Sequence, residues 1–209
     1  MLRSPCEPSL YVKREGDDIL IVCLYVYDLI YASSKQEMVE EFKRRLMAEF
    51  EMSDLGLMRY FLGIQVKQSK EGIFISQEKY AEDLLKKFNM INCKPMGTPM
   101  ALTEKLFKED GEQKADPQVF RSLVGSLIYL TNTRSDIVYV VGVVSRFMSD
   151  PSKLHFTAAK RKLRYVKGTK NFGIRYEKED DNSLVGYTDS DWAGSIDDRK
   201  VLLDRKSVV

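Results

Sequence analysis

The stretch Ile19-Leu-Ile-Val-Cys-Leu-Tyr-Val-Tyr-Asp-Leu-Ile-Tyr-Ala-Ser-Ser34 decides how this chain folds. Its β-branched and aromatic residues favour strands, yet a single carboxylate, Asp28, lies at its centre. An ionised carboxylate among apolar side chains is costly unless it is paired, hydrogen-bonded or bound to a metal. Either Tyr27-Asp28 is the turn of a β-hairpin, in which Asp28 bonds its own backbone, or a tight hairpin presents Asp28 in a cleft as a metal ligand. The residues alone favour the turn and leave both interpretations open.

The flanking residues extend this stretch into an antiparallel meander that leads into a helix. Leu10–Lys13 is predicted as a short strand, and the turn Glu15–Asp18 joins it to the strand Ile19–Val26. Leu29–Ala32 is the third strand. Ser34 and Glu37 then stand at the spacing of a capping box. The helix that they open has one apolar face, formed by Met38, Phe42, Leu46 and Phe50.

The middle of the chain predicts a second hairpin and then a break in the pattern. The hairpin joins Tyr60–Lys67 to Gly72–Gln77, and a helix covers residues 78–90. Two prolines and a glycine make Cys93–Pro99 an extended connector, and the polar segment Thr103–Asp116 is predicted to be a mobile loop. We therefore place the main organisational boundary between residues 92 and 116.

Three helices and a strand pair are predicted beyond this boundary. The first helix begins at Asp116-Pro117 and runs to Thr131, the second is capped by Ser135-Asp136 and ended by Pro151, and the third covers Leu154–Lys167. The first helix is expected to bury Phe120, Leu123, Val124, Leu127 and Ile128. The strands Phe172–Glu177 and Leu184–Thr188 are expected to pair with each other.

The composition excludes several classes of protein. With 209 residues, 44% of them hydrophobic, and a net charge of +2, the chain suits a globular protein of one large or two small domains without a global affinity for nucleic acid. Its three cysteines are far apart and His155 is its one histidine, so we expect no zinc site and an intracellular, reducing location in the cytoplasm or nucleus. The apolar runs at 19–27 and 137–144 are shorter than the roughly 20 residues of a membrane helix, and no secretory signal is visible.

Two further groups of residues are candidate sites. Asp189 ends a predicted strand in the sequence Asp189-Ser-Asp191-Trp192, where it is either a metal ligand or a turn cap. The third helix is basic, and its charged side chains either contact phosphates or form a solvated face over the core. The basic residues proposed to contact nucleic acid are Lys160, Arg161, Arg164 and Lys167. No phosphate-binding glycine loop or nucleophile elbow is present.

Taken together, the ordered segments resemble the Pol polyprotein of Ty1/copia-type retrotransposons, from the middle of the reverse transcriptase into RNase H. The matching segments are Leu24-Tyr-Val-Tyr-Asp-Leu-Ile30, Met58-Arg-Tyr-Phe-Leu-Gly-Ile64, Gly97-Thr-Pro99, Phe120-Arg-Ser-Leu-Val-Gly-Ser-Leu-Ile-Tyr-Leu130, Thr133-Arg-Ser-Asp-Ile137, Leu163-Arg-Tyr-Val-Lys-Gly-Thr169, Gly186-Tyr-Thr-Asp-Ser-Asp-Trp-Ala-Gly194 and Asp197-Asp-Arg-Lys200. Their order and spacing carry the resemblance, which covers nearly the whole chain.

The resemblance implies an α+β fold in four parts. Residues 1–92 would be the C-terminal half of a reverse transcriptase palm, an antiparallel sheet with helices. Residues 93–116 would be a connector and mobile loop, and residues 117–170 a helical thumb or connection region. Residues 171–209 would be the truncated beginning of an RNase H-like sheet. The activity implied is RNA-directed DNA synthesis, and the partner implied is an RNA/DNA primer-template. The resemblance implies no association with a membrane. No feature of the sequence indicates an oligomeric state.

Departures from the family pattern predict that this chain is inactive. The family uses Mg²⁺ or Mn²⁺ held by paired carboxylates in a Tyr-x-Asp-Asp motif, and here the motif reads Tyr25-Val26-Tyr27-Asp28. Asp28 is the remaining polymerase carboxylate and metal ligand, and Tyr27 replaces the other. The partner aspartate of the preceding palm strand would lie before residue 1. Asp189 corresponds to the first RNase H carboxylate and metal ligand, but the chain departs from the family pattern after Lys200, and the family's downstream glutamate and aspartate do not follow. A residual nucleic-acid-binding module or a non-functional relic is the alternative.

Overall fold

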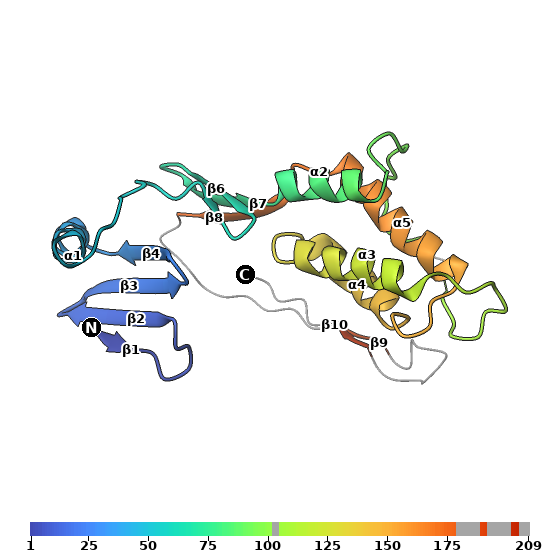
Figure 1. Ribbon diagram of the computed structural model, residues 1–209, viewed down its shortest axis with the longest axis horizontal. Coiled ribbons are helices and arrows are strands. Elements are labelled where there is room, and N and C mark those ends of the chain that lie inside the picture. The colour runs from blue at the N-terminus through green and yellow to red at the C-terminus, as the bar shows by residue number, and fades with distance from the viewer. Residues whose placement is uncertain (102–104, 179–188, 192–201, 205–209) are drawn as a thin grey trace. The chain divides into compact units, whose positions relative to one another are not determined.

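The computed structural model describes residues 1–101, 105–178, 189–191 and 202–204. The chain forms two compact units, Met1–Met58 and Arg59–Val209, whose elements are labelled in Figure 1. The predicted boundary between residues 92 and 116 does not coincide with this division. The hydrophobic core of the second unit contains residues from both sides of that boundary, such as Leu84 before it and Leu123 after it.

The first unit is the predicted meander with one helix. Its antiparallel sheet has the order β1-β2-β3-β4 and is followed by α1, Gln36–Glu49. The strands are β1 Leu2–Arg3, β2 Leu10–Glu15, β3 Asp18–Tyr25 and β4 Asp28–Ser33. Because side chains alternate along β3, Leu20 and Val22 share one face and are buried with Met38 of α1. The sequence did not predict β1, a two-residue strand that pairs with β2.

The predicted capping box at the start of α1 is wrong. The N-cap residue of the helix is Lys35, and no side chain caps it. The Ser34 hydroxyl instead accepts the Ile19 backbone N–H at 3.0 Å and donates to the Asp18 carboxylate at 3.0 Å. The β3–β4 hairpin brings these groups together, so Ser34, the residue after β4, is linked to the first residues of β3. The predicted apolar face of α1 is buried only in part, because Phe50 is 62% exposed.

The second unit contains another four-stranded sheet, of order β5-β6-β7-β8. Its strands are β5 Tyr60–Phe61, β6 Ile64–Gln68, β7 Gly72–Ser76 and β8 Gly173–Glu177. The β6–β7 hairpin was predicted, but its first strand, predicted as Tyr60–Lys67, is divided into β5 and β6, which pair antiparallel with each other. β8 pairs antiparallel with β7, a partner that the sequence did not predict. Leu184–Thr188, the predicted partner of this strand, lies outside the described residues. Gly173 permits this pairing, because a Cβ there would lie 2.1 Å from the Ile75 carbonyl oxygen.

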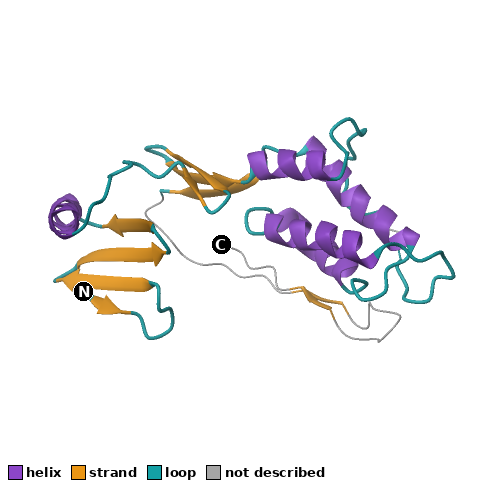
Figure 2. Cartoon of the chain, in the orientation of Figure 1, coloured by secondary structure: helices purple, strands orange, loops and turns teal. Residues whose placement is uncertain are grey.

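The second unit also contains helices (Figure 2). They are α2 Glu78–Lys87, α3 Pro117–Leu130, the short 3₁₀ helix η1 Ser135–Ile137, α4 Val138–Ser145 and α5 Lys153–Gly168. Their apolar faces share one core, to which α2 contributes Leu84 and Leu85, α3 contributes Leu123, and α5 contributes Leu163. This shared core explains why α2 does not belong to the same compact unit as the first sheet.

Of the two caps that the sequence predicted for these helices, one is confirmed. The Asp116 carboxylate accepts the N–H groups of Gln118 and Val119, as the cap of α3 should. At α5 the cap is Ser152, in a capping box with His155. The predicted cap Ser135-Asp136 is wrong, because these residues form η1 and Asp136 pairs with Arg134 instead. Ile128 of α3, predicted to be buried, is 43% exposed.

The segment predicted to be a mobile loop, Thr103–Asp116, contacts the start of α5 in its described part. Residues 102–104 lie outside the described residues, but Lys114 forms a β-bridge with Ser152.

Further along the chain, β9 Asp189–Asp191 pairs antiparallel with β10 Leu202–Asp204. None of the helices that the structure describes has the length and apolarity needed to cross a membrane.

Candidate functional site

Asp28 lies at the tip of the β3–β4 hairpin, but outside the turn itself. The turn consists of Val26 and Tyr27, and the Cα of Asp28 faces that of Tyr25 as the first pair of the ladder. Two-residue hairpin turns favour a positive φ, and Val26 adopts a φ of 54°. The prediction that Tyr27-Asp28 forms the turn is therefore wrong by one residue. Asp28 is exposed, and the Tyr27 side chain is 94% exposed.

The described residues around Asp28 do not form a metal-binding group. No cluster of three or more His, Cys, Asp or Glu side chains occurs among the residues for which the structure gives positions. The other acidic residues of the hairpin, Asp17 and Asp18, belong to its opposite end. Since Asp18 precedes Tyr25 by seven residues, it lies about 23 Å from the tip at about 3.3 Å per strand residue. A single carboxylate does not suffice to hold two Mg²⁺ ions, each of which needs several oxygen ligands.

Three of the four basic residues singled out on α5 bind the connector of their own chain. Arg161 donates to the Thr98 hydroxyl at 3.0 Å, Arg164 to the Lys94 carbonyl at 2.8 Å, and Lys167 to the Cys93 carbonyl at 2.5 Å. The fourth, Lys160, is exposed, and its amine lies 4.9 Å from the centre of the Phe156 ring. Oxygen atoms of the connector thus accept one hydrogen bond from each of three cations that the sequence assigns to phosphates. The predicted role of these residues in nucleic-acid binding stays a prediction.

The connector also approaches the end of α5 closely. The backbone N–H of Met96 donates to the Arg164 carbonyl at 3.1 Å. At Gly168 an added Cβ would lie 3.3 Å from the Cβ of Pro95, so a larger residue there would press on the connector. Backbone contacts and side-chain donors together hold residues 93–98 along α5.

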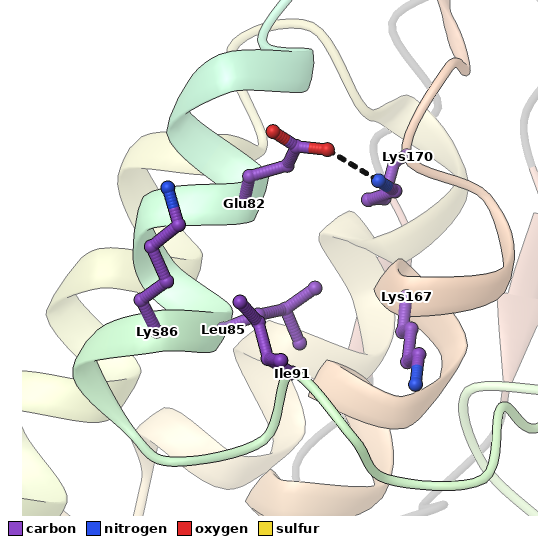
Figure 3. A pocket seen from close by; sticks show the side chains of 6 residues that line it. All are labelled: Glu82, Leu85, Lys86, Ile91, Lys167 and Lys170. Atoms are coloured by element: carbon purple, nitrogen blue, oxygen red, sulfur yellow. Dashed lines mark hydrogen bonds and ion pairs between the residues drawn. The ribbon is translucent and has the colours of Figure 1, made fainter.

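A pocket of about 250 Å³ opens between α2 and α5 (Figure 3). It is lined by Glu82, Leu85, Lys86, Ile91, Lys167 and Lys170. Lys170 pairs with Glu82 across the pocket, and this contact lowers the pKa of Glu82 and raises the pKa of Lys170. Lys167 extends away from this pair, toward the Cys93 carbonyl. The lysines therefore do not converge on one point, and the pocket offers no preformed anion site.

Asp189, the candidate RNase H carboxylate, belongs to β9. Its backbone is in register with Asp204 of β10. The sequence shows no further family carboxylates after Lys200 to accompany it. The role of Asp189 as a metal ligand stays a prediction.

Arg134 is a buried cation of the second unit that the sequence did not single out. Its side chain is 2% exposed and binds both carboxylate oxygens of Asp136, at 2.8 and 2.7 Å. It also donates to the carbonyl and hydroxyl oxygens of Thr169 at the end of α5. Burial alone would raise the pKa of Asp136, but the hydrogen bonds and charge of Arg134 hold it below its usual value. The signal in the sequence was an arginine two residues from an aspartate beside an apolar helix.

Comparison with known proteins gives consistent matches. The family model described as reverse transcriptase (RNA-dependent DNA polymerase) matches residues 1–102. The Retrovirus-related Pol polyprotein from transposon RE1 of Arabidopsis thaliana is 40% identical over 94% of the chain, and that from transposon TNT 1-94 of Nicotiana tabacum is 38% identical over 95%. The chain spans only 13% and 16% of these polyproteins, but 75% of an uncharacterized mitochondrial protein of Arabidopsis thaliana that is 42% identical to it. No solved structure matched.

Proposed function

This chain belongs to the reverse transcriptase family of copia-type retrotransposon Pol polyproteins, and we propose that it is a polymerase segment that does not catalyse DNA synthesis. The substrate class implied by the family is a nucleic-acid primer-template, and the family chemistry requires Mg²⁺ or Mn²⁺. In this proposal the hairpin of β3 and β4 keeps the backbone of the polymerase site, while the ligand set needed for the metals is incomplete.

The observation that carries the proposal is the residue at position 27. Where the family motif has the first of two adjacent aspartates, this chain has tyrosine. A phenol is neutral near pH 7, since its ordinary pKa is about 10, and hard cations prefer charged oxygen ligands. Asp28 is left without a neighbouring carboxylate at the hairpin tip. The loss at position 27 holds whatever chain or segment supplies the other parts of a polymerase.

Primer extension tests this proposal directly. We expect no extension product from the purified chain with an RNA template, a DNA primer, nucleoside triphosphates and either Mg²⁺ or Mn²⁺. The Asp28→Ala variant sets the background, since it removes the remaining carboxylate. Templated product above that background would overturn the proposal.

The physical reason for inactivity can be measured separately from activity. Tyr27→Asp restores two adjacent carboxylates at the tip, so Mn²⁺ should bind at least tenfold more tightly than in the unchanged chain. Tyr27→Asn, which is similar in size but uncharged, is the matched control. Paramagnetic broadening of the amide signals of the tip reports binding at this place. Equal Mn²⁺ binding by the unchanged chain and by Tyr27→Asp would show that Tyr27 is not the cause.

A residual nucleic-acid-binding role is the second candidate, and Lys160 supports it. Its amine is exposed on α5, whereas Arg161, Arg164 and Lys167 donate to the connector. If primer-template binds this helix, Lys160 is the residue free of hydrogen bonds to the connector that can contact a phosphate. The other three each hold a donor on a connector oxygen, so this proposal assigns the phosphate contact to Lys160.

The salt dependence of primer-template binding distinguishes a residue that contacts phosphate from one that only holds the connector. Each phosphate contact contributes about one unit to the slope of log K against log salt concentration. We therefore expect Lys160→Ala to reduce that slope by about one unit, measured by fluorescence anisotropy with a labelled primer-template. Arg164→Ala is the control, and it should leave the slope unchanged while loosening the connector. An undetectable interaction at low salt would remove the binding role altogether.

A further inference from the structure

The one histidine of the chain is buried at the beginning of α5. His155 is the third residue of this helix and is 0% exposed. Its ring stacks on Phe147 in the turn that follows α4, with 3.8 Å between the ring centres and 14° between their planes. A titratable ring that is enclosed in this way changes its protonation state only if its hydrogen-bond partners permit it.

The partners of the ring determine which nitrogen carries the proton. The backbone N–H of Ser152 donates to Nδ1 of His155 at 3.0 Å. Because a backbone N–H can only donate, Nδ1 must be an acceptor without a proton. In the neutral ring the proton then lies on Nε2, which is 2.9 Å from the Phe107 carbonyl oxygen and donates to it. The Ser152 hydroxyl completes the capping box by accepting the His155 backbone N–H.

The ring thereby joins α5 to residues 105–116, which we call the strap. His155 bonds the Phe107 carbonyl of the strap. In addition, the hydroxyl of Ser152 donates to the Asp110 carboxylate of the strap. Backbone bonds continue the contact, from Lys153 N–H to the Gln113 carbonyl at 2.8 Å and from Ala115 N–H to the Pro151 carbonyl at 2.9 Å. All these bonds meet within residues 151–155, so the strap depends on the geometry of the first turn of α5.

The charged groups around the ring come from the strap and from the start of α5. From the strap, the Asp110 carboxylate faces Nε2 at 3.7 Å. The ammonium of Lys114 pairs with Asp150 at 2.6 Å, and that of Lys153 donates to the Gln113 side chain. From the turn that follows α4 the ring meets uncharged Phe147. The Ser152 hydroxyl lowers the pKa of Asp110, so this carboxylate stays ionised while an imidazole titrates.

We propose that His155 is an acid-sensitive latch, and that protonation of its Nδ1 releases the strap from α5. A proton taken from solvent by Nδ1 places an N–H against the N–H of Ser152, and two donors cannot bond each other. The capping box then opens, which leaves the Ser152 N–H without its acceptor inside the protein. Since the bonds of the strap converge on this turn, residues 105–116 separate from the helix. Release restores water as the partner of both donors.

The latch can be tested on the unchanged chain because no other histidine gives a signal. With ¹⁵N-labelled imidazole, the two ring nitrogens should report the Nε2–H form near pH 7. As the ring is titrated toward acid, the hydrogen-exchange protection factors of the Ala115 and Lys153 amides should fall at least tenfold, while circular dichroism shows that the helices remain. An Nδ1–H ring near pH 7, strap protection unchanged through the titration, or a ring that titrates only on global unfolding would each overturn the proposal.

His155→Gln is the matched variant. A glutamine at this position of a capping box accepts the N–H of the capping residue and does not titrate. Its strap protection should change less than twofold over the pH range in which the ring of the unchanged chain titrates. A loss of protection equal to that of the unchanged chain would assign the release to another group, such as Asp110.

Discussion

Replacing Arg134 with methionine is expected to lower the free energy of unfolding of the second unit by about 2–4 kcal/mol. Removing one member of a buried ion pair leaves its partner uncompensated, which typically costs about 3–5 kcal/mol. Asp136 keeps 32% of its side chain exposed, so water offsets part of this loss. The substitution also removes both bonds to Thr169, at the point where α5 ends. Methionine has the length of the arginine stem and preserves most of the packing.

Urea denaturation followed by the helical circular dichroism signal measures this effect. Arg121→Met is the matched control, because Arg121 is exposed on α3 and makes one longer hydrogen bond, to the Met148 carbonyl at 3.3 Å. The control should change the stability by less than about 0.5 kcal/mol. Equal effects of the two substitutions would show that the Arg134 network does not stabilise the fold.

The same pair predicts a pH dependence. Because the folded-state pKa of Asp136 is below its unfolded value, the stabilisation is present above the unfolded pKa and is lost as the pH falls through the folded pKa. The loss of stability on acidification should therefore be smaller in Arg134→Met than in the unchanged chain.

Replacing Phe120 with alanine is expected to lower the free energy of unfolding by about 3–5 kcal/mol, the usual cost of emptying a fully buried phenylalanine site. The Phe120 side chain is 0% exposed in the shared core of α2 to α5. Its ring lies 6.2 Å from that of Phe156, so truncation removes a contact between α3 and α5. Surrounding side chains relax only in part around such a cavity.

A matched control for Phe120 lies on the same helix. Ile128 is 43% exposed, although the sequence pattern predicted it to be buried. Ile128→Ala should lower the stability by less than about 1 kcal/mol, because much of its apolar surface already faces water. The difference between the two variants in urea denaturation would be small if α3 were rotated about its axis relative to the structure.

Local sequence signals predicted the elements whose partners are near in the chain. The β3–β4 hairpin followed from an apolar, β-branched run interrupted at its centre, and α3 followed from Asp116-Pro117, because a cap bonds N–H groups only two or three residues away. The position of the turn differed by one residue, since Val26 takes the positive φ that glycine or asparagine more often supplies. The capping serine of α1 was misassigned because Asp18, distant in sequence, takes its hydroxyl.

The candidate sites divide in the same way. The residue types of the polymerase motif, with Tyr27 before Asp28, can be read in the sequence. The hydrogen-bond partners of the α5 cations could not be predicted from the sequence. Arg161, Arg164 and Lys167 bond to residues more than sixty positions earlier in the chain. Sequence spacing on a helix gives the face that a side chain occupies but not the segment that packs against it.

The sequence by itself determined the family and the hairpin, and it contains the residues, Tyr27 and Asp28, on which the proposal of inactivity rests, because these depend on residue identity and on neighbours within one turn. Only the tertiary structure decided that β8 pairs with β7, that α2 shares its core with α3 to α5, and that the connector occupies the basic side chains of α5. These contacts join residues far apart in the chain, and their free energy depends on complementary packing and burial that no local pattern encodes. Position 27, in contrast, needs no partner to be read, since a phenol cannot replace a carboxylate as a ligand of two metal ions.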